Sequence, residues 1–231
     1  KIKPENNQLA LTTGWSIIPY LRQSPLNIAT CFATLNDRNS VTITKNNAGK
    51  IYMPSLDINQ IGNMLPGEGY QLYINKVDTL IYPANSAGRS SLNEVQDYDA
   101  RNIKLDYEFT GNNASLILDI DADDNSEIAV MNNENMIVGA GRVVNGRTVI
   151  AIWGKDELID ENNYSEMRIM NYDINTKKFT EISGIEFTDI IANKTYKSLI
   201  YNKDAVYVAK AISSDLKLSV NPNPFSNITE V

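Results

Sequence analysis

From Leu9 to Ile212 the chain is a succession of short strand-like runs, and each run ends within a few residues at Gly, Asn, Asp or Pro. Runs such as Val41–Thr44 and Thr148–Trp153 have the length and the β-branched and aromatic content typical of strands. None approaches the roughly 18–20 apolar residues that a membrane-spanning helix needs. The sequence therefore predicts a mainly β protein with no membrane span.

Residues 1–83 are predicted to form a small β-rich module that contains one short helix at most. The helix is expected over Asn27–Leu35, where apolar residues recur at the i, i+3, i+4 and i+7 spacing. Cys31 belongs to that apolar pattern, so we expect it to be a buried core thiol. Residues 84–96 have small and polar side chains with little to bury, and we interpret them as a linker between two domains.

Residues 97–213 are predicted to form the second domain, a β-sandwich of the Ig-like or jelly-roll type. Short strand-like runs recur there with turn signals between them, as is typical of sandwiches. Asn145-Gly146 is a strong signal for a two-residue hairpin, since both residues tolerate positive φ. Residues 214–231 begin with another short run, but two prolines then prevent a continuing central strand. We expect this last segment to be a further linker.

The composition excludes several classes of chemistry. The chain has no histidine, which excludes the commonest general base and the Ser-His and Cys-His nucleophile pairs. Its single cysteine excludes an internal disulfide and a Cys-rich zinc site. With 28 acidic against 21 basic residues and a net charge of −7, the surface offers no field for a polyanion. We therefore expect neither an enzyme nor a nucleic-acid-binding protein.

The end of the chain, Leu216–Thr229, is a strand-like run followed by Asn-Pro-Asn-Pro-Phe at residues 221–225 and then by small polar residues. It resembles the opening of the C-terminal sorting domain that type IX secretion cargo of Bacteroidetes carries. We expect residues 214–231 to hold the truncated start of that domain. The resemblance implies export by the type IX secretion machinery to the outer cell surface or the medium, and a larger parent protein.

Two further stretches resemble modules that recur beside this signal in Bacteroidetes surface proteins. Gly14–Pro19, together with Gly49–Pro54 and Ile61–Leu72, is similar to a module marked by Gly-Trp and Gly-Tyr motifs. Ile137–Gly141 and Ala151–Asp156 are similar to a β-sandwich repeat marked by Ala-Ile-Trp-Gly-Asp-Asp, with Lys in place of the first Asp. These resemblances imply a surface address and a β architecture, and no particular activity.

The densest acidic cluster is a candidate cation site. Oxygen-bearing side chains alternate through Asp119, Asp121, Asp123, Asn125 and Glu127, and calcium takes about six to eight oxygen ligands. The sixth position lacks the Gly of a calcium loop, and the twelfth lacks its bidentate Glu. We therefore leave open two interpretations, a calcium ion or a solvated loop, and expect no other cofactor.

Aromatic residues offer a second candidate site. A planar ring covers the apolar face of a sugar while Asn and Asp bond its hydroxyls. The candidates for carbohydrate binding are Tyr52, Tyr70 and Tyr73 in the first module and Tyr164 in the second. Tyr also favours half-buried strand positions, so a structural role for these rings is the competing interpretation. Both tryptophans lie inside apolar runs, and we expect them in the core.

These features predict a non-catalytic extracellular module of a secreted or cell-surface protein, acting as a structural, adhesion or assembly unit. Its partners would be other surface proteins, further copies of the chain or extracellular polysaccharide, besides the secretion machinery. The alternative is a carbohydrate-binding accessory module of a polysaccharide-degrading enzyme, which requires exposed coplanar aromatic rings. A self-contained hydrolase requires a buried carboxylate pair, which nothing in the sequence distinguishes.

Overall fold

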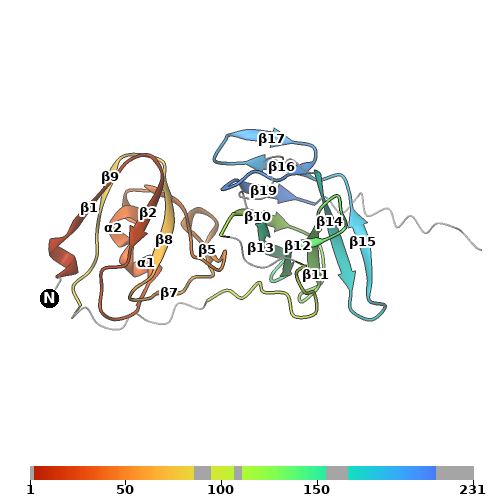
Figure 1. Ribbon diagram of the computed structural model, residues 1–231, viewed down its shortest axis with the longest axis horizontal. Coiled ribbons are helices and arrows are strands. Elements are labelled where there is room, and N and C mark those ends of the chain that lie inside the picture. The colour runs from red at the N-terminus through yellow and green to blue at the C-terminus, as the bar shows by residue number, and fades with distance from the viewer. Residues whose placement is uncertain (1–2, 86–94, 107–110, 155–165, 212–231) are drawn as a thin grey trace, which may run out of the picture.

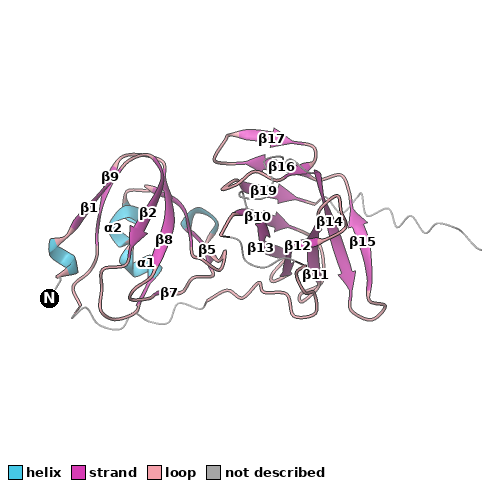
Figure 2. Ribbon diagram, viewed as in Figure 1, coloured by secondary structure: helices cyan, strands magenta, loops and turns pink. Residues whose placement is uncertain are grey.

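The computed structural model describes residues 3–85, 95–106, 111–154 and 166–211. Strands make up 47% of the chain and helices 8%, so the mainly β prediction is confirmed (Figure 2). The described strands pair in two groups, which we call the N-terminal unit, residues 3–85, and the sandwich, residues 111–211. The connecting segment, residues 95–106, runs from one unit to the other (Figure 1).

The N-terminal unit is built on a five-stranded sheet with the order β2-β8-β4-β5-β6, beside two small two-stranded sheets, β1-β9 and β3-β7. Its elements are η1 (Pro4–Asn6), β1 (Gln8–Leu11), β2 (Gly14–Pro19), β3 (Leu26–Asn27), α1 (Ile28–Cys31), α2 (Ala33–Asp37), β4 (Val41–Lys45), β5 (Ile51–Met53), η2 (Pro54–Leu56), β6 (Ile58–Asn59), β7 (Asn63–Met64), β8 (Gly69–Ile74) and β9 (Asp78–Ile81).

The single helix expected over Asn27–Leu35 is two short helices, α1 and α2. Asn27 caps the first, because its side-chain oxygen accepts the backbone N–H of Ala29 at 2.9 Å. Phe32 leaves the helical conformation with φ −103° and ψ 15°, and this separates the two helices. The apolar spacing located the segment correctly, but it carries no signal for this break. Cys31 is buried as predicted, and burial raises the pKa of its thiol to about 12.

The sandwich consists of two sheets with the strand orders β13-β10-β19-β16-β17 and β12-β11-β14-β15, and β18 pairs with β14. Most pairs are antiparallel, while β10 and β19 are parallel. The strands are β10 (Asn113–Asp119), β11 (Glu127–Met131), β12 (Ile137–Arg142), β13 (Arg147–Trp153), β14 (Glu166–Asp173), β15 (Lys178–Ile182), β16 (Glu186–Asp189), β17 (Lys194–Tyr196), β18 (Leu199–Ile200) and β19 (Val206–Lys210).

The turn at Asn145-Gly146 forms, with φ of 52° and 72° at its two residues and a bridge from Val144 to Arg147, but the predicted pairing of its flanking strands as a hairpin is wrong. The strands on either side of it, β12 and β13, belong to opposite sheets. They cross closely because two residues of β12 have no side chain. A Cβ on Gly139 would lie 2.7 Å from the carbonyl oxygen of Ala151, and one on Gly141 would lie 2.6 Å from a side-chain oxygen of β13.

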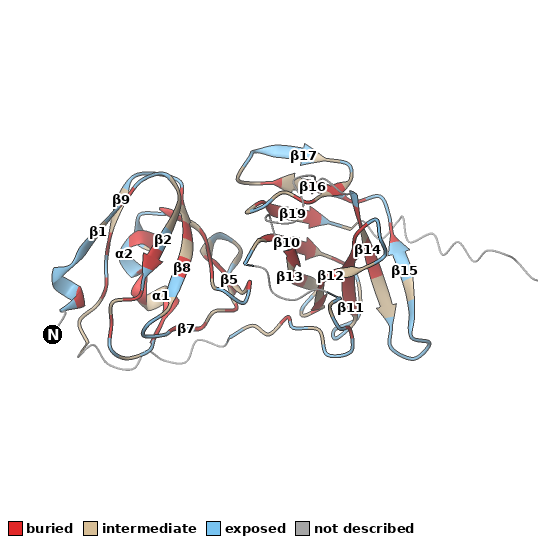
Figure 3. Ribbon diagram, in the orientation of Figure 1, coloured by how far each residue is buried: buried red, intermediate tan, exposed pale blue. Residues whose placement is uncertain are grey.

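Apolar side chains fill three successive layers of the molecule. One cluster lies between α1, α2 and the five-stranded sheet of the N-terminal unit. A second lies between that sheet and the β13-β10-β19 sheet, and a third lies inside the sandwich. Strand β10 is therefore covered on both faces and is buried along nearly its whole length, whereas β17 at the edge of its sheet is largely exposed (Figure 3).

Candidate functional site

Two of the tyrosines predicted to bind carbohydrate are buried. Tyr52 is 6% exposed and Tyr70 is 2% exposed, so neither ring is open to a sugar, and the prediction is wrong for these two residues. Tyr73 is partly buried and contacts the ring of Trp15 edge to face, with centroids 5.3 Å apart. Tyr164 lies outside the described residues. The strand positions of Tyr52, Tyr70 and Tyr73 therefore serve packing, as in the competing structural interpretation.

The hydroxyl groups of the two buried tyrosines have partners inside the N-terminal unit. The Tyr52 hydroxyl accepts a hydrogen bond from the Asn36 amide at 2.8 Å. The Tyr70 hydroxyl donates to the Glu68 carboxylate at 2.7 Å and accepts the backbone N–H of Leu65 at 2.9 Å. Burial raises the pKa of both phenols, and both stay neutral in the folded protein.

The residues of the predicted cation site are directed to different partners. Asp119 accepts a hydrogen bond from Nε of Arg147 at 2.6 Å, and Asn125 accepts one from Nη1 of Arg142 at 2.8 Å. Asp121 and Asp123 are exposed. Among the described residues, no three His, Cys, Asp or Glu side chains form a group that could hold a metal ion.

Glu127, the fifth residue of that predicted site, instead anchors the connecting segment. It is 3% exposed, and its carboxylate accepts the backbone N–H groups of Arg101, Asn102 and Ile103 at 2.7–3.0 Å. The Asn102 side-chain amide adds a fourth donor at 2.9 Å. These donors stabilise the buried charge. Sequence reasoning missed this role because the segment that supplies the donors is 24 to 26 residues away.

The apolar interface between the N-terminal unit and the sandwich is the most distinctive feature of the molecule. The N-terminal sheet contributes strands β4, β5 and β6, the sandwich contributes β10, β13 and β19, and the connecting segment contributes Tyr98. The eight buried members of this cluster are Ile43, Ile51, Met53, Ile58, Tyr98, Ile117, Val149 and Val206. Because side chains of both units lose contact with water in one cluster, the two units stabilise each other.

A close contact between a turn of the N-terminal unit and strand β13 fixes how near the units approach. Gly49 has φ +75° and lies against Trp153, which is 2% exposed. A Cβ on Gly49 would lie 2.5 Å from Cβ of Ala151. Only glycine therefore fits this position, both for its backbone conformation and for the space beside it. Trp153 is buried as predicted, and its ring lies beside Gly49 of the other unit.

A lysine lies inside this interface. Lys45, at the end of β4, is 0% exposed, and its Nζ donates to the backbone and side-chain oxygens of Asn113 at 3.3 and 3.4 Å. The ring of Trp15 lies 5.1 Å from Nζ. Burial lowers the pKa of Lys45 to about 8, and the negative charges of Asp204 and Asp189 oppose that decrease. An amine of this kind spends an appreciable fraction of time neutral near neutral pH.

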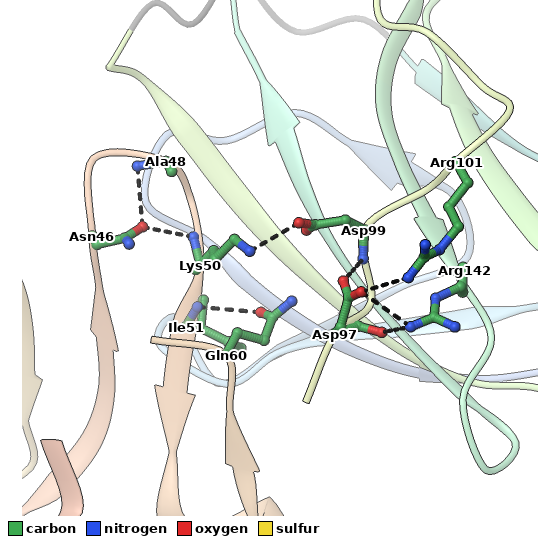
Figure 4. A network of polar contacts seen from close by, with 9 residues as sticks. All are labelled: Asn46, Ala48, Lys50, Ile51, Gln60, Asp97, Asp99, Arg101 and Arg142. Atoms are coloured by element: carbon green, nitrogen blue, oxygen red, sulfur yellow. Dashed lines mark hydrogen bonds and ion pairs between the residues drawn. The ribbon is translucent and has the colours of Figure 1, made fainter. Parts of the chain in front are cut away.

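A network of polar contacts, which we call the polar rim, links the N-terminal unit, the connecting segment and β12 (Figure 4). Lys50 of the N-terminal unit forms an ion pair with Asp99 of the connecting segment at 2.8 Å. Asp97 in turn pairs with Arg101 at 2.9 Å and with Arg142 of β12 at 3.2 Å. These partly exposed pairs each contribute little to stability, about 1 kcal/mol or less. Their geometry nevertheless holds the connecting segment to both units.

The described end of the predicted linker is docked against the N-terminal unit. The Gln96 side chain accepts the backbone N–H of Asn59 at 3.0 Å and donates to the carbonyl of Asp57 at 2.9 Å. Val95 occupies the space beside Gly62, where a Cβ would lie 2.6 Å from the valine side chain. Residues 86–94 lie outside the described residues. At its described end, therefore, the predicted linker is part of the packed structure.

Two grooves flank the interface. The first, of about 700 Å³, is lined by polar side chains of both units and of the connecting segment, among them Asn59, Gln96 and Asn145. The second, of about 640 Å³, is more apolar and lies between the N-terminal unit and residues of β16 and β19. Neither groove contains the exposed, coplanar rings expected of a sugar platform.

Comparison of the chain with protein-family models, with curated proteins and with solved structures finds no significant match. None of the helices in the described part of the chain is long and apolar enough to cross a membrane.

Proposed function

We propose that this chain is a non-catalytic extracellular module of a secreted or cell-surface protein and that it acts as a rigid structural or adhesion unit. The apolar cluster shared by the two units carries the proposal. Domains joined by a flexible linker move independently, whereas a hydrophobic interface of this kind holds them as one body. A rigid body with a fixed distance between its ends is what a spacer or an adhesin repeat requires.

The address of the protein rests on its last residues. Residues 221–225, Asn-Pro-Asn-Pro-Phe, support export by type IX secretion machinery. These residues lie outside the described part of the chain. In the parent protein, removal of the segment that begins at residue 214 should prevent release to the surface or the medium. Fractionation of cells with an antibody against the sandwich tests this.

The burial of Tyr52 and Tyr70 weakens the carbohydrate-binding alternative. If the chain binds a sugar, the polar groove beside Gln96 is the candidate binding site. The deciding experiment measures binding of the purified chain to a panel of soluble and insoluble polysaccharides. Each measurement is made with calcium and again after chelation, since Asp119, Asp121 and Asp123 remain the candidates for calcium ligands.

A structural or adhesion unit predicts no saturable binding to any glycan. In that case, self-association is followed by light scattering over a concentration series, and binding to other surface proteins is tested next. Saturable binding to one glycan class, abolished by Gln96→Ala but not by the distant exposed substitution Ile174→Ala, would overturn the proposal in favour of an accessory binding module.

A further inference from the structure

The amine of Lys45 and the side-chain amide of Asn113 meet across the interface of the two units. Lys45 ends strand β4, and Asn113 begins strand β10, 68 residues later. Nζ lies 3.4 Å from Oδ1 of Asn113. Since a C=O bond is about 1.23 Å long, Cγ of the amide lies at most about 4.6 Å from Nζ. An amine and an amide carbon are therefore within a small side-chain movement of contact.

The surroundings of this pair favour nucleophilic attack. Lys45 is 0% exposed and Asn113 is 4% exposed, so water is excluded from both. Burial disfavours the ammonium form of Lys45, and the ring of Trp15, 5.1 Å from Nζ, offsets only part of that effect. With a pKa near 8, about a tenth of the amine is neutral at pH 7, and more at higher pH. Buried lysines activated in this way are effective nucleophiles.

We propose that Lys45 and Asn113 are the two partners of an intramolecular isopeptide bond that joins the N-terminal unit covalently to the sandwich. Nζ of the neutral lysine attacks Cγ of Asn113, and an Nζ–Cγ bond forms. The Cγ–Nδ2 bond breaks, and Nδ2 leaves as ammonia with a proton that Nζ gives up. The exchange of one amide for another needs neither an oxidant nor a further reactant.

Two carboxylates are placed to assist the proton transfer. The charges of Asp204 and Asp189 both act on the Lys45 amine. Asp189 accepts the backbone N–H groups of Ile191 and Ala192 and holds a turn. Asp204 is bonded to the reacting residue itself, since its backbone N–H donates to the carbonyl of Asn113 at 3.1 Å. Among the described residues no ion pair within 4.0 Å joins Lys45 to either carboxylate, so the proposal includes a movement of the Asp204 side chain toward Nζ to relay the proton to Nδ2.

The bond would lie where it has the largest mechanical consequence. Lys45 and Asn113 belong to different sheets, so the cross-link would prevent the two units from separating even after their apolar contacts are lost. The inference does not depend on the proposed surface role, because the chemistry involves only residues of this chain.

The test is the mass of the purified full chain, kept folded at about pH 8 to favour the neutral amine. We expect a mass lower than the sequence mass by one ammonia molecule. After trypsin digestion, peptides 39–50 and 105–142 should be recovered as one branched species, since cleavage after a modified Lys45 is blocked. Lys45→Met and Asn113→Ala should each abolish both signals. The matched control Lys50→Met on the same hairpin should keep the loss of ammonia, and its branched species should join peptides 39–76 and 105–142, because the cleavage site after residue 50 is removed. Asp204→Asn should slow the loss of ammonia.

Circular dichroism checks that each variant is folded. The decisive result comes from the chain without substitutions. Folded protein whose mass stays at the sequence value, with peptides 39–45 and 105–142 recovered separately, would overturn the proposal. A loss of ammonia that maps to Asn145-Gly146, where a cyclic imide forms by attack of the backbone, would overturn it as well. An unchanged rate in Asp204→Asn would remove Asp204 from the mechanism.

Discussion

Strand β10 has two buried faces, and its side chains on one face differ in polarity from those on the other. The face toward β11 and β14 carries Ala114, Leu116 and Leu118, which are all apolar and belong to the sandwich core. The face toward the N-terminal unit carries Ile117 together with the polar Asn113 and Ser115, all of them at most 4% exposed. The face of β10 inside the sandwich is therefore apolar, whereas its face at the interface of the units combines apolar and polar side chains.

This difference reflects how the strands inside the sandwich and the two sheets at the interface are aligned. A sandwich core forms between strands of one unit, and complementary apolar shapes are enough to align them. Two separate sheets that meet face to face slide more easily, and polar groups that must be satisfied restrict them to one arrangement. Burying the Lys45 amine costs free energy. Because its hydrogen-bond acceptors belong to Asn113 of the other unit, the same amine favours one relative position of the two sheets.

The largest effect is expected from Leu116→Ala in the sandwich core. This side chain is fully buried, and its truncation should lower the free energy of unfolding by about 2–5 kcal/mol. Ile117→Ala on the opposite face of β10 should also destabilise the chain, but it should in addition make the connecting segment easier to cleave with protease. Urea denaturation and limited proteolysis check the pair. A loss below about 1 kcal/mol in Leu116→Ala would contradict the assignment of the core.

The next effect is expected from Gly49→Ala at the interface. The added Cβ would lie too close to Ala151, and alanine would have to adopt the positive φ of this position. We therefore expect the free energy of unfolding to fall by about 2–4 kcal/mol and the units to dock more weakly. Gly67→Ala is the matched control, because Gly67 has φ +87° with nothing within 4 Å of an added Cβ. It should cost only about 1 kcal/mol. Equal losses in the two variants would show that the contact between the Gly49 turn and β13 is unimportant.

A smaller effect is expected from pH. In Asn113→Ala the Lys45 amine cannot be acylated and titrates in the folded state with its pKa lowered from about 10.5 by burial. The unfolded chain then binds more protons between about pH 8 and 10, so the free energy of unfolding should rise with pH, by roughly 2 kcal/mol. The same measurement on Asn113→Ala with Lys45→Met should show no such rise. A rise that persists in the double variant would assign the effect to another group.

The smallest effect is expected at the rim. The backbone N–H of Asp99, followed by the charges of Arg142 and Arg101, lowers the pKa of Asp97. Its contribution is therefore present above the ordinary carboxyl pKa and is lost as pH falls through the lower folded value. Because Asp97 is well exposed, Asp97→Asn should cost less than about 1 kcal/mol at neutral pH. Acid denaturation should separate this variant from Asp121→Asn, an exposed substitution that should leave the acid limb unchanged.

Local signals predicted much of the fold. Helical structure between Asn27 and Leu35, the Asn145-Gly146 turn and the succession of short strands are all found in the structure. Each depends on residues close together in the sequence. The pairing of β12 and β13 with opposite sheets could not be predicted in this way, because it depends on the close crossing that Gly139 and Gly141 permit.

The candidate site was harder to predict because its two halves come from different units. Alternation along β4 places Lys45 on the same face as the buried Ile43, and this pattern was a usable signal that the lysine is buried. Its partner Asn113 gives no such signal, since asparagines beside a glycine are typical of turns. The near-continuous apolar run of β10 was also consistent with a strand covered on both faces, but what covers the second face is a long-range property.

The central claim is that the two units share one core and behave as a single body. Differential scanning calorimetry of the full chain tests it most directly, through the ratio of the calorimetric to the van't Hoff enthalpy of unfolding. We predict one transition in which the two enthalpies agree, and its separation into two transitions in Gly49→Ala. Two independent transitions in the chain without substitutions, with a calorimetric enthalpy well above the van't Hoff value, would contradict the claim.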